Sequence, residues 1–177
     1  LSRYGNGAMA IRTIACLPAF VGAYGKRGGG CLAGTSTAGA FAMKEALRED
    51  FMTKKTRTIN MNRLGWALNE LNDPPIQSLY VYHSNPASVT PDQNQVLKGL
   101  AREDLFTVVH ERFMTDTARY ADIVLPSTSS LEHSDLYRSY GTYCIQRAKA
   151  AIPPVGESKS NREVFSLLAQ RMQFQEP

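Results

Sequence analysis

Three short apolar runs stand out in the second half of the chain, and each is followed by a polar cluster. They span residues 78–83, 105–110 and 123–125 and are rich in β-branched and aromatic side chains. Runs of this length and composition are typical of strands buried on both faces of a parallel sheet. The segment between the first two runs is long enough to return the chain for parallel pairing.

That returning segment has the pattern of a helix. Thr90 is placed to cap it, and Val96, Leu97 and Leu100 supply its apolar face. After the third run, a Tyr-rich stretch over residues 136–145 has the composition of a strand. We expect it to pair at the edge of the sheet.

Two further helices are predicted near the other strands. After the second run, Thr115 or Asp116 can cap a short helix that ends by residue 121. The chain closes with an amphipathic helix over 160–172, capped by Ser160. Its predicted inward face consists of Val164, Phe165, Leu167, Leu168 and Met172.

The beginning of the chain carries weaker signals. A helix with one apolar face is predicted over residues 7–16, and Pro18 begins to end it. A glycine-rich stretch over 22–30 follows. It could cradle a phosphate, or it could be a turn after the helix. Its spacing matches neither the dinucleotide fingerprint nor the P-loop, which favours the turn.

These patterns give a fold class and a division of the chain. We predict an α/β fold with an open, mainly parallel sheet in a three-layer arrangement, with helices on both faces. Residues 1–30 form a helix and glycine-rich turn. Residues 31–75 form an irregular linker, with a short helix over 40–49, and a helix over 60–71. Residues 76–177 form the α/β core.

Composition and charge narrow the class of protein. The chain has 177 residues, of which 43% are hydrophobic and 20% charged, as is ordinary for one compact globular domain. A net charge of +4 and a pI near 9.0 would favour phosphate-bearing ligands. Because the Lys and Arg residues are scattered along the chain, we do not expect nucleic-acid binding.

The cysteines and the hydropathy bear on the compartment. Cys16, Cys31 and Cys144 lie far apart without Cys-x-x-Cys spacing, which argues against a disulfide framework, a zinc site or an iron–sulfur cluster in this chain. No apolar run approaches the ~20 residues of a membrane span, and no leader is recognisable. These signals favour a cytoplasmic location. Because the chain does not begin with Met, we expect a piece of a longer protein.

Two familiar catalytic patterns are suggested by the sequence, and both fail on geometry or spacing. The loop over 129–135 contains serine, histidine and acids, but triad members come from separate elements and need a base oriented by a third group. His83, His110 and His133 match no familiar metal-ligand spacing, even with nearby carboxylates. We therefore assign no catalytic residue and no metal ligand.

A nucleotide site at the strand ends fits the polar clusters better. In an open α/β sheet, ligands bind beyond the carboxyl ends of the strands. Glu111, at the end of the second strand, can accept hydrogen bonds from ribose hydroxyls, and Asn85 offers both edges that a purine requires. The free N–H groups near Thr115 can face a pyrophosphate. Each of these residues could instead serve only as a cap or turn residue.

Three motifs mark the strand ends: Asn85-Pro86, the segment 108–126 (VVHERFMTDTARYADIVLP) and Glu132-His133. Together they resemble the molybdopterin oxidoreductase family, the relatives of dimethyl sulfoxide reductase and formate dehydrogenase. Residues 3–30 also resemble that family's helix and glycine-rich turn. The resemblance implies an internal fragment of a larger multidomain enzyme. Its molybdenum or tungsten would be held by two pterin dithiolenes, each with a guanine dinucleotide tail.

By position, the resemblance implies the residues that bind one molybdopterin guanine dinucleotide. They are Asn85, Ser88, His110, Glu111, Thr115, His133 and Asn161. Many relatives have Asp at the position of Asn161, and Gly is expected at the position of Gln173.

The resemblance also implies which parts of such an enzyme lie elsewhere. The metal-ligating residue, the N-terminal cysteines of an iron–sulfur cluster and the domain that covers the pterins have no counterpart here, so this chain alone should be inactive. Its expected partners are the remaining domains of its own full-length chain and an electron-transfer subunit, with no nucleic acid and no membrane span. The alternative is a stand-alone nucleotide-binding or protein-interaction module without redox activity.

Overall fold

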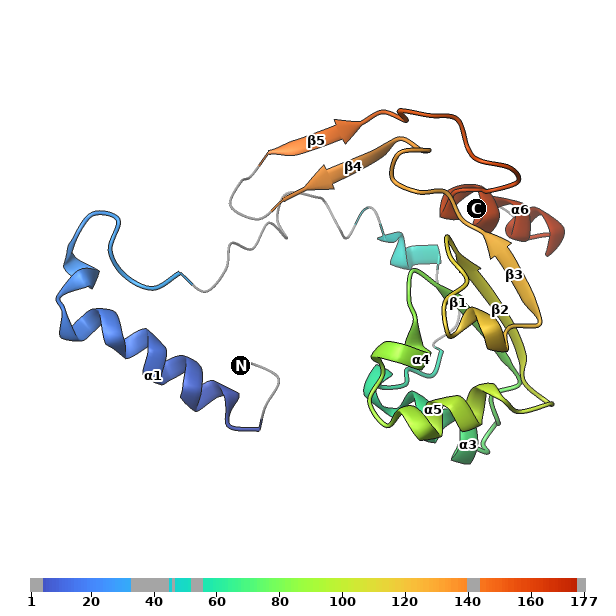
Figure 1. Ribbon diagram of the computed structural model, residues 1–177, viewed down its shortest axis with the longest axis horizontal. Helices are drawn as coiled ribbons and strands as arrows, with labels where there is room; N and C mark the ends of the chain where they lie inside the picture. Colours follow the sequence, from blue (N-terminus) through green and yellow to red (C-terminus); the bar gives the residue numbers. More distant parts are fainter. Residues whose placement is uncertain (1–4, 33–44, 46, 52–55, 140–143, 175–177) are drawn as a thin grey trace. The chain divides into compact units, whose positions relative to one another are not determined.

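The computed structural model describes residues 5–32, 45, 47–51, 56–139 and 144–174 (Figure 1). The chain divides into two compact units. Leu1–Ala46 and Tyr137–Gln146 form the first, and Leu47–Leu136 and Arg147–Pro177 form the second. The predicted helix over 40–49 lies largely outside the described residues.

The described part of the chain contains α-helices (α), short 3-10 helices (η) and β-strands (β). They are α1 (Gly7–Phe20), η1 (Ala23–Gly25), η3 (Glu49–Phe51), η4 (Met61–Arg63), α3 (Leu64–Glu70), β1 (Ser78–Tyr82), α4 (Pro86–Val89), α5 (Gln93–Leu100), β2 (Phe106–Glu111), η5 (Ala118–Tyr120), β3 (Ile123–Pro126), β4 (Asp135–Arg138), β5 (Ile145–Ala148) and α6 (Asn161–Arg171).

A parallel sheet forms the centre of the second unit, where the three apolar runs predicted strands. Its strand order is β1-β2-β3, with Ser78 paired to Phe106 and Val108 paired to Ile123. Short β-branched and aromatic runs form such strands because both faces of each strand can be covered. The predicted strands and their parallel pairing are confirmed.

Successive side chains of β1 point to opposite faces of this sheet, and each face is covered by different helices. Leu79 packs against the core that α3 and α5 help to form, and Val81 packs against η5. Tyr80 and Tyr82 instead contact Phe165 of α6, with ring centroids 5.6 Å and 5.1 Å apart. The predicted three-layer arrangement with helices on both faces is therefore confirmed (Figure 1).

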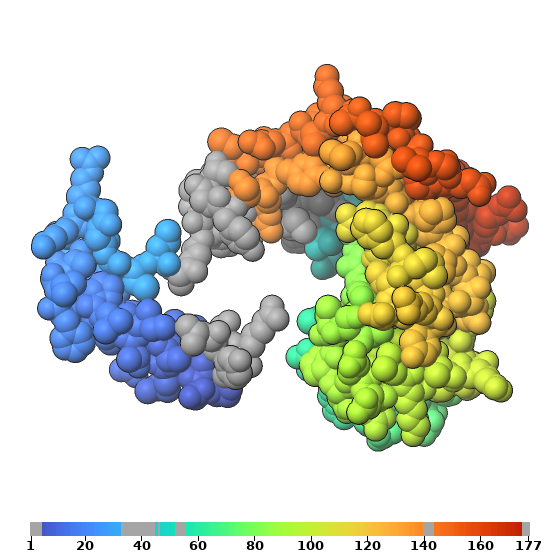
Figure 2. Space-filling model, viewed as in Figure 1, coloured from blue at the N-terminus to red at the C-terminus, as the bar shows by residue number. Residues whose placement is uncertain are grey.

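The main core lies between the sheet and the layer of α3, α4 and α5. Val96 and Leu100 of α5 are buried and Leu97 packs against them, so the predicted apolar face of the crossover is correct. Gly99 permits the close approach of α3, because a Cβ there would lie 2.5 Å from the Cβ of Leu68. Helix α3 thus lies with the core, although its sequence fell in the 31–75 segment. Figure 2 shows the green atoms of α4 and α5 and the yellow atoms that follow them as one continuous surface.

The connection from β1 to β2 differs from the prediction at its start. It contains an additional helix, α4, which four residues cannot reveal through periodicity. Asn85 is the N-terminal cap residue of α4, and its carbonyl accepts hydrogen bonds from the backbone nitrogens of Ser88 and Val89 at 3.0 Å and 3.1 Å. Thr90 ends this helix rather than capping α5, which starts after Asp92.

Helix α6 begins as its sequence predicted. Ser160 and Glu163 form a capping box: the backbone nitrogen of Ser160 donates to Glu163 Oε2 at 2.8 Å, and Ser160 Oγ accepts from the backbone nitrogen of Glu163 at 3.4 Å. Val164 is buried, but the rest of the predicted inward face is at least 36% exposed. Beyond the helix, Gln173 has a φ of 56°, a left-handed conformation that explains the expectation of Gly there.

The Tyr-rich segment does not extend the main sheet. β4 and β5 pair with each other in a separate two-stranded sheet, so the prediction of an edge strand was wrong. The backbone N–H and C=O groups of β4 and β5 can form hydrogen bonds with each other, so neither strand needs a partner in the main sheet. Across the described ranges, no helix combines the length and apolar character needed to cross a bilayer.

In the first unit, α1 extends to Phe20, so Pro18 lies inside the helix instead of ending it. Near the last turn, a proline removes one backbone hydrogen bond and leaves few others to disrupt. Gly22 follows with a φ of 62°, and its nitrogen donates to the carbonyl of Ala19 at 3.0 Å. This geometry supports the turn interpretation of the glycine-rich stretch.

Candidate functional site

The carboxyl ends of β1, β2 and β3 share one edge of the sheet because the strands are parallel. The sequence-predicted residues gather at this edge, but in two groups rather than one. One group lies on the side of α4 and η5, and the other lies on the side of α6. The end of the central strand, β2, separates them.

The first group is built around Asn85. Its Oδ1 accepts hydrogen bonds from Thr117 Oγ1 at 2.7 Å and from the Thr117 nitrogen at 3.2 Å. Its Nδ2 donates to Ser88 Oγ at 3.1 Å, and that hydroxyl donates to Asp116 Oδ2 at 2.8 Å. The structure thus brings Asn85 and Ser88 together and joins the end of β1 to the loop after β2.

Two threonines complete this group. Thr115 Oγ1 accepts from the backbone nitrogen of Ala118, the first residue of η5, at 3.2 Å, although the N-terminal cap residue of that helix is Thr117. Thr117 is fully buried, and its hydroxyl also accepts from the nitrogen of Ala87 at 3.0 Å. The sequence reasoning missed Thr117, since a buried threonine carries no chemical signal of its own.

His110 and Glu111 end the central strand and point to opposite faces of the sheet. The His110 side chain is only 1% exposed, and its Nε2 lies 3.1 Å from the carbonyl oxygen of Lys159. It therefore contacts the chain that enters α6. Its Nδ1 is buried without a hydrogen-bond partner among the described residues, and the contact of His110 with a dinucleotide stays a prediction.

Glu111 retains an available carboxylate oxygen. Its Oε1 accepts from the backbone nitrogen of Arg112 at 2.7 Å, with the Arg112 Nε at 3.7 Å. Within the part of the chain that the structure describes, no donor hydrogen-bonds to Oε2. The side chain is held in place by one oxygen while the other remains able to accept.

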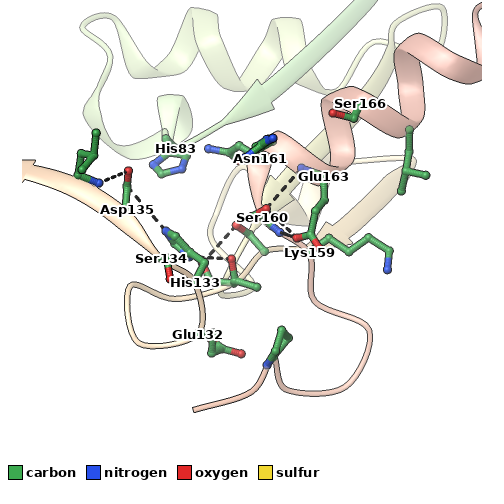
Figure 3. A pocket seen from close by; sticks show the side chains of 16 residues that line it. His83, Glu132, His133, Ser134, Asp135, Lys159, Ser160, Asn161, Glu163 and Ser166 are labelled. Carbon is green, nitrogen blue, oxygen red and sulfur yellow. Dashed lines mark hydrogen bonds and ion pairs between the residues drawn. The ribbon is translucent and has the colours of Figure 1, made fainter. Parts of the chain in front are cut away.

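The second group lines a pocket of about 990 Å³ on the α6 side of the sheet (Figure 3). The pocket is bounded by the end of β1, the loop after β3 and the first two turns of α6. Its lining residues are His83, Ser127, Thr128, Glu132, His133, Ser134, Asp135, Leu136, Pro154, Lys159, Ser160, Asn161, Arg162, Glu163, Ser166 and Leu167.

Both predicted residues of this group, His133 and Asn161, line the pocket. His133 Nδ1 lies 2.9 Å from Thr128 Oγ1, and its Nε2 lies 3.9 Å from Asp135 Oδ2. Asn161 is the first residue of α6. Its Oδ1 is buried and has no hydrogen-bond partner among the described residues. An orphaned acceptor is costly in a folded protein and calls for a donor that the chain itself does not supply.

Glu132 shapes the pocket without offering a free group to a ligand. Its Oε2 accepts from the nitrogen of Ser129 and its Oε1 from that of Val155, both at 2.7 Å, and Ser158 Oγ lies 3.3 Å from Oε1. Hydrogen bonds from Ser129, followed by those from Val155 and Ser158, lower the pKa of Glu132 to about 2. Its role is to hold the loop.

His83 also lines the pocket, although its place in the sequence suggested no contact with a nucleotide. It follows β1 with a φ of 52°, a backbone conformation that is uncommon for residues other than Gly, although Asn, Asp and His adopt it more often than the rest. Over the described ranges, no group of three or more His, Cys, Asp or Glu side chains is placed to hold a metal ion.

Comparison with known proteins shows which family the chain resembles. Residues 1–171 match the model of the family described as molybdopterin oxidoreductase. The chain is 51% identical over 170 residues to Probable oxidoreductase YoaE of Bacillus subtilis (strain 168), a match that covers 96% of this chain and 25% of that protein. It is 33% identical over 178 residues to Probable oxidoreductase YyaE of the same organism, covering 99% and 26%.

One solved structure is similar to part of the chain. Acetylene hydratase from Pelobacter acetylenicus aligns with a TM-score of 0.57 and 27% identity over 66% of this chain and 16% of that chain. The chain spans about a quarter of the length of the two Bacillus proteins. Because the family match extends over nearly the whole sequence, the chain belongs to the molybdopterin oxidoreductase family.

Proposed function

We propose that this chain binds the guanine dinucleotide tail of a bis-pterin molybdenum or tungsten cofactor within a larger oxidoreductase. The family implies a molybdenum or tungsten pterin cofactor. When bound, that group supplies the redox chemistry, and the residues of this chain bind and orient its tail. The iron–sulfur cluster and the electron-transfer partner of the proposal belong to parts of the protein outside this sequence.

The orphaned oxygen of Asn161 is the observation that carries this proposal. Guanine presents N–H donors along one edge, including the exocyclic amino group that distinguishes it from adenine. Asn161 Oδ1 is a buried acceptor without a partner in the described structure, and it lies at the wall of a pocket. A guanine edge would satisfy it, and an Asp, which many relatives have at this position, would offer the same acceptor.

The dimensions and the neighbouring groups of the pocket also suit a nucleotide. Its volume of about 990 Å³ is at the upper end of the range for small-molecule and cofactor sites. Lys159 and Arg162 place positive charge at its wall, at the start of α6, where the helix dipole also favours anions. The three carboxylates of the lining, Glu132, Asp135 and Glu163, each accept a hydrogen bond from a backbone nitrogen of the chain. The pocket therefore combines a base-recognising amide with groups that attract phosphate.

On the α4 and η5 side of the sheet edge, the proposed contacts to the tail come from Glu111 and from the group around Asn85. The free Oε2 of Glu111 can accept from ribose hydroxyls. Thr115 and Ser88 offer hydroxyls beside it on the loop and helix that follow the strands. His110, in our proposal, acts beneath this surface by holding the backbone of Lys159 in place.

The reaction of the full-length protein is not fixed by this fold. The aligned relatives are named as oxidoreductases, whereas the aligned structure is named as a hydratase. One fold can carry different reactions. Oxidoreductase activity of the full-length protein therefore remains part of the proposal, while the family match over residues 1–171 does not favour the stand-alone module.

Guanine nucleotide titration tests the proposal. GDP added to the ¹⁵N-labelled chain should shift the amide signals of Asn161, His133 and Glu111, and ADP should shift them less. Asn161→Ala should weaken the response, whereas Asn161→Asp should keep it because the acceptor is retained. Shifts confined to residues 26–30 would refute the assignment of the site.

A further inference from the structure

We propose that His83 is a base-contacting residue of this pocket and that its imidazole ring stacks on the purine of the bound nucleotide. The inference rests on the proposed nucleotide site and adds a residue that neither the sequence motifs nor the family comparison assigned. It is carried by the backbone conformation of His83, by the contacts that fix its ring and by the position of that ring in the pocket.

The backbone of His83 has a positive φ of 52°, which is uncommon for a residue other than Gly. Among the described residues other than Gly, positive φ angles occur at Arg48, His83, Asp92 and Gln173. Asp and His tolerate this region better than most residues, and Gln173 follows the end of a helix, where the left-handed conformation is common. His83 directly follows β1, which is only partly buried, and Gly would adopt this conformation at lower cost. Residues other than Gly in this region cluster at functional sites, and His83 lies at the pocket wall.

The ring of His83 is exposed but held in orientation. It meets the ring of Tyr82 edge-on, with centroids 6.0 Å apart and an interplanar angle of 84°. Tyr82 in turn meets Phe165 of α6 at 5.1 Å and 77°. The contact with Tyr82 favours one orientation of the imidazole, which reduces the side-chain freedom that is lost on binding.

The ring lies in the part of the pocket where a base is expected. Figure 3 shows His83 and Asn161 projecting into the pocket from the strand end and from α6. If the Asn161 amide recognises the edge of the guanine, a flat ring nearby can cover the face of that base. Histidine is one of the aromatic side chains on which bases stack in nucleic-acid-binding proteins.

Titration of GDP and CDP into four forms of the chain tests the inference. The four forms are the unchanged chain, His83→Gly, His83→Phe and Asp92→Gly. Asp92→Gly is the matched control, because Asp92 also has a positive φ, of 56°, but does not line the pocket. His83→Gly should weaken GDP binding on the order of tenfold, as loss of one stacking partner does, and narrow the preference for GDP over CDP. Its melting temperature should not fall, since Gly adopts a positive φ without steric cost.

The other two variants and the melting temperatures separate a stacking role of His83 from a structural one. His83→Phe should keep most of the GDP affinity, because it retains a ring, and Asp92→Gly should bind GDP like the unchanged chain. Equal GDP affinity in the unchanged chain and in His83→Gly would overturn the stacking role and leave the proposed function standing. A fall in melting temperature together with lost binding in His83→Gly would make His83 a structural residue and also overturn it. Absence of GDP binding by the unchanged chain would instead overturn the proposed function.

Discussion

Glu132 Oε1 lies 2.7 Å from the backbone nitrogen of Val155, a residue 23 positions later in the chain. The other oxygen of the same carboxylate accepts from the nitrogen of Ser129, also at 2.7 Å. One side chain thus ties the loop after β3 to the segment that leads into α6. Because both segments border the pocket, this carboxylate helps to set the width of the pocket.

The same contacts predict a dependence of stability on pH. The pKa of Glu132 is lowered from 4.5 to about 2, chiefly by hydrogen bonds from Ser129. Because the pKa of the folded state is depressed, the stabilisation is complete above about pH 4.5 and is lost as the pH falls toward about 2. Urea titrations should show this loss in the unchanged chain and a smaller loss in Glu132→Gln. Glu163 has a pKa lowered by Ser160, so some dependence on pH remains in both. Identical pH profiles would contradict the role of Glu132.

Thr117 should contribute to stability through its hydroxyl. In Thr117→Val the buried nitrogen of Ala87 loses its acceptor, and Asn85 Oδ1 keeps only the longer of its two bonds. We expect the free energy of unfolding to fall by about 2 kcal/mol, the usual cost of a buried unsatisfied group. Thr117→Ser keeps the hydroxyl and serves as the control. Equal losses in the two variants would mean that packing of the methyl group, not hydrogen bonding, is what matters.

Gly99 should be intolerant of even one added methyl group. A Cβ at this position would lie 2.5 Å from the Cβ of Leu68, where α5 packs on α3. Gly99→Ala should therefore lower the free energy of unfolding by about 1–3 kcal/mol through overpacking, although Ala is the better helix former. Gly25→Ala is the matched control, because an added Cβ there meets no described atom within 4 Å. Chemical denaturation of both variants decides the point.

Gln173 offers a stabilising substitution. Its φ of 56° lies just beyond the end of α6, in the left-handed region that costs a side chain with a Cβ. Gln173→Gly should raise the free energy of unfolding by about 1 kcal/mol. Gln170→Gly, within the helix, should instead lower it by about 1 kcal/mol. A stabilising effect of both, measured by thermal unfolding, would show that the benefit does not come from the helix end.

The sequence predicted those parts of the fold that depend on local signals. The β-branched runs became strands, and the Ser160 and Glu163 pair became the capping box of α6. The sequence did not predict features that depend on how distant segments pack together. Thr90 has the chemistry of a cap, yet the chain places it at the end of a four-residue helix that has no detectable period. Phe165 belongs to an apolar face, but periodicity does not reveal how much of that face is covered.

The same limit applies to the candidate site. Asn85 and Ser88 were predicted together, and a hydrogen bond joins them. His110 was expected beside Glu111 at one surface, but successive strand residues point to opposite faces, and the backbone of Lys159 covers the histidine. That covering segment lies 49 residues away in sequence, so no local pattern could have placed it.

The backbone of Lys159 continues the edge of the sheet immediately before α6. Its nitrogen donates to the carbonyl of Pro126 at 3.1 Å, and its carbonyl accepts from the nitrogen of Thr128 at 3.2 Å, forming a parallel bridge beside Ser127. These two hydrogen bonds tie the start of α6 to the end of β3. This wall of the cavity is therefore already formed without a ligand, and binding would require little rearrangement of it.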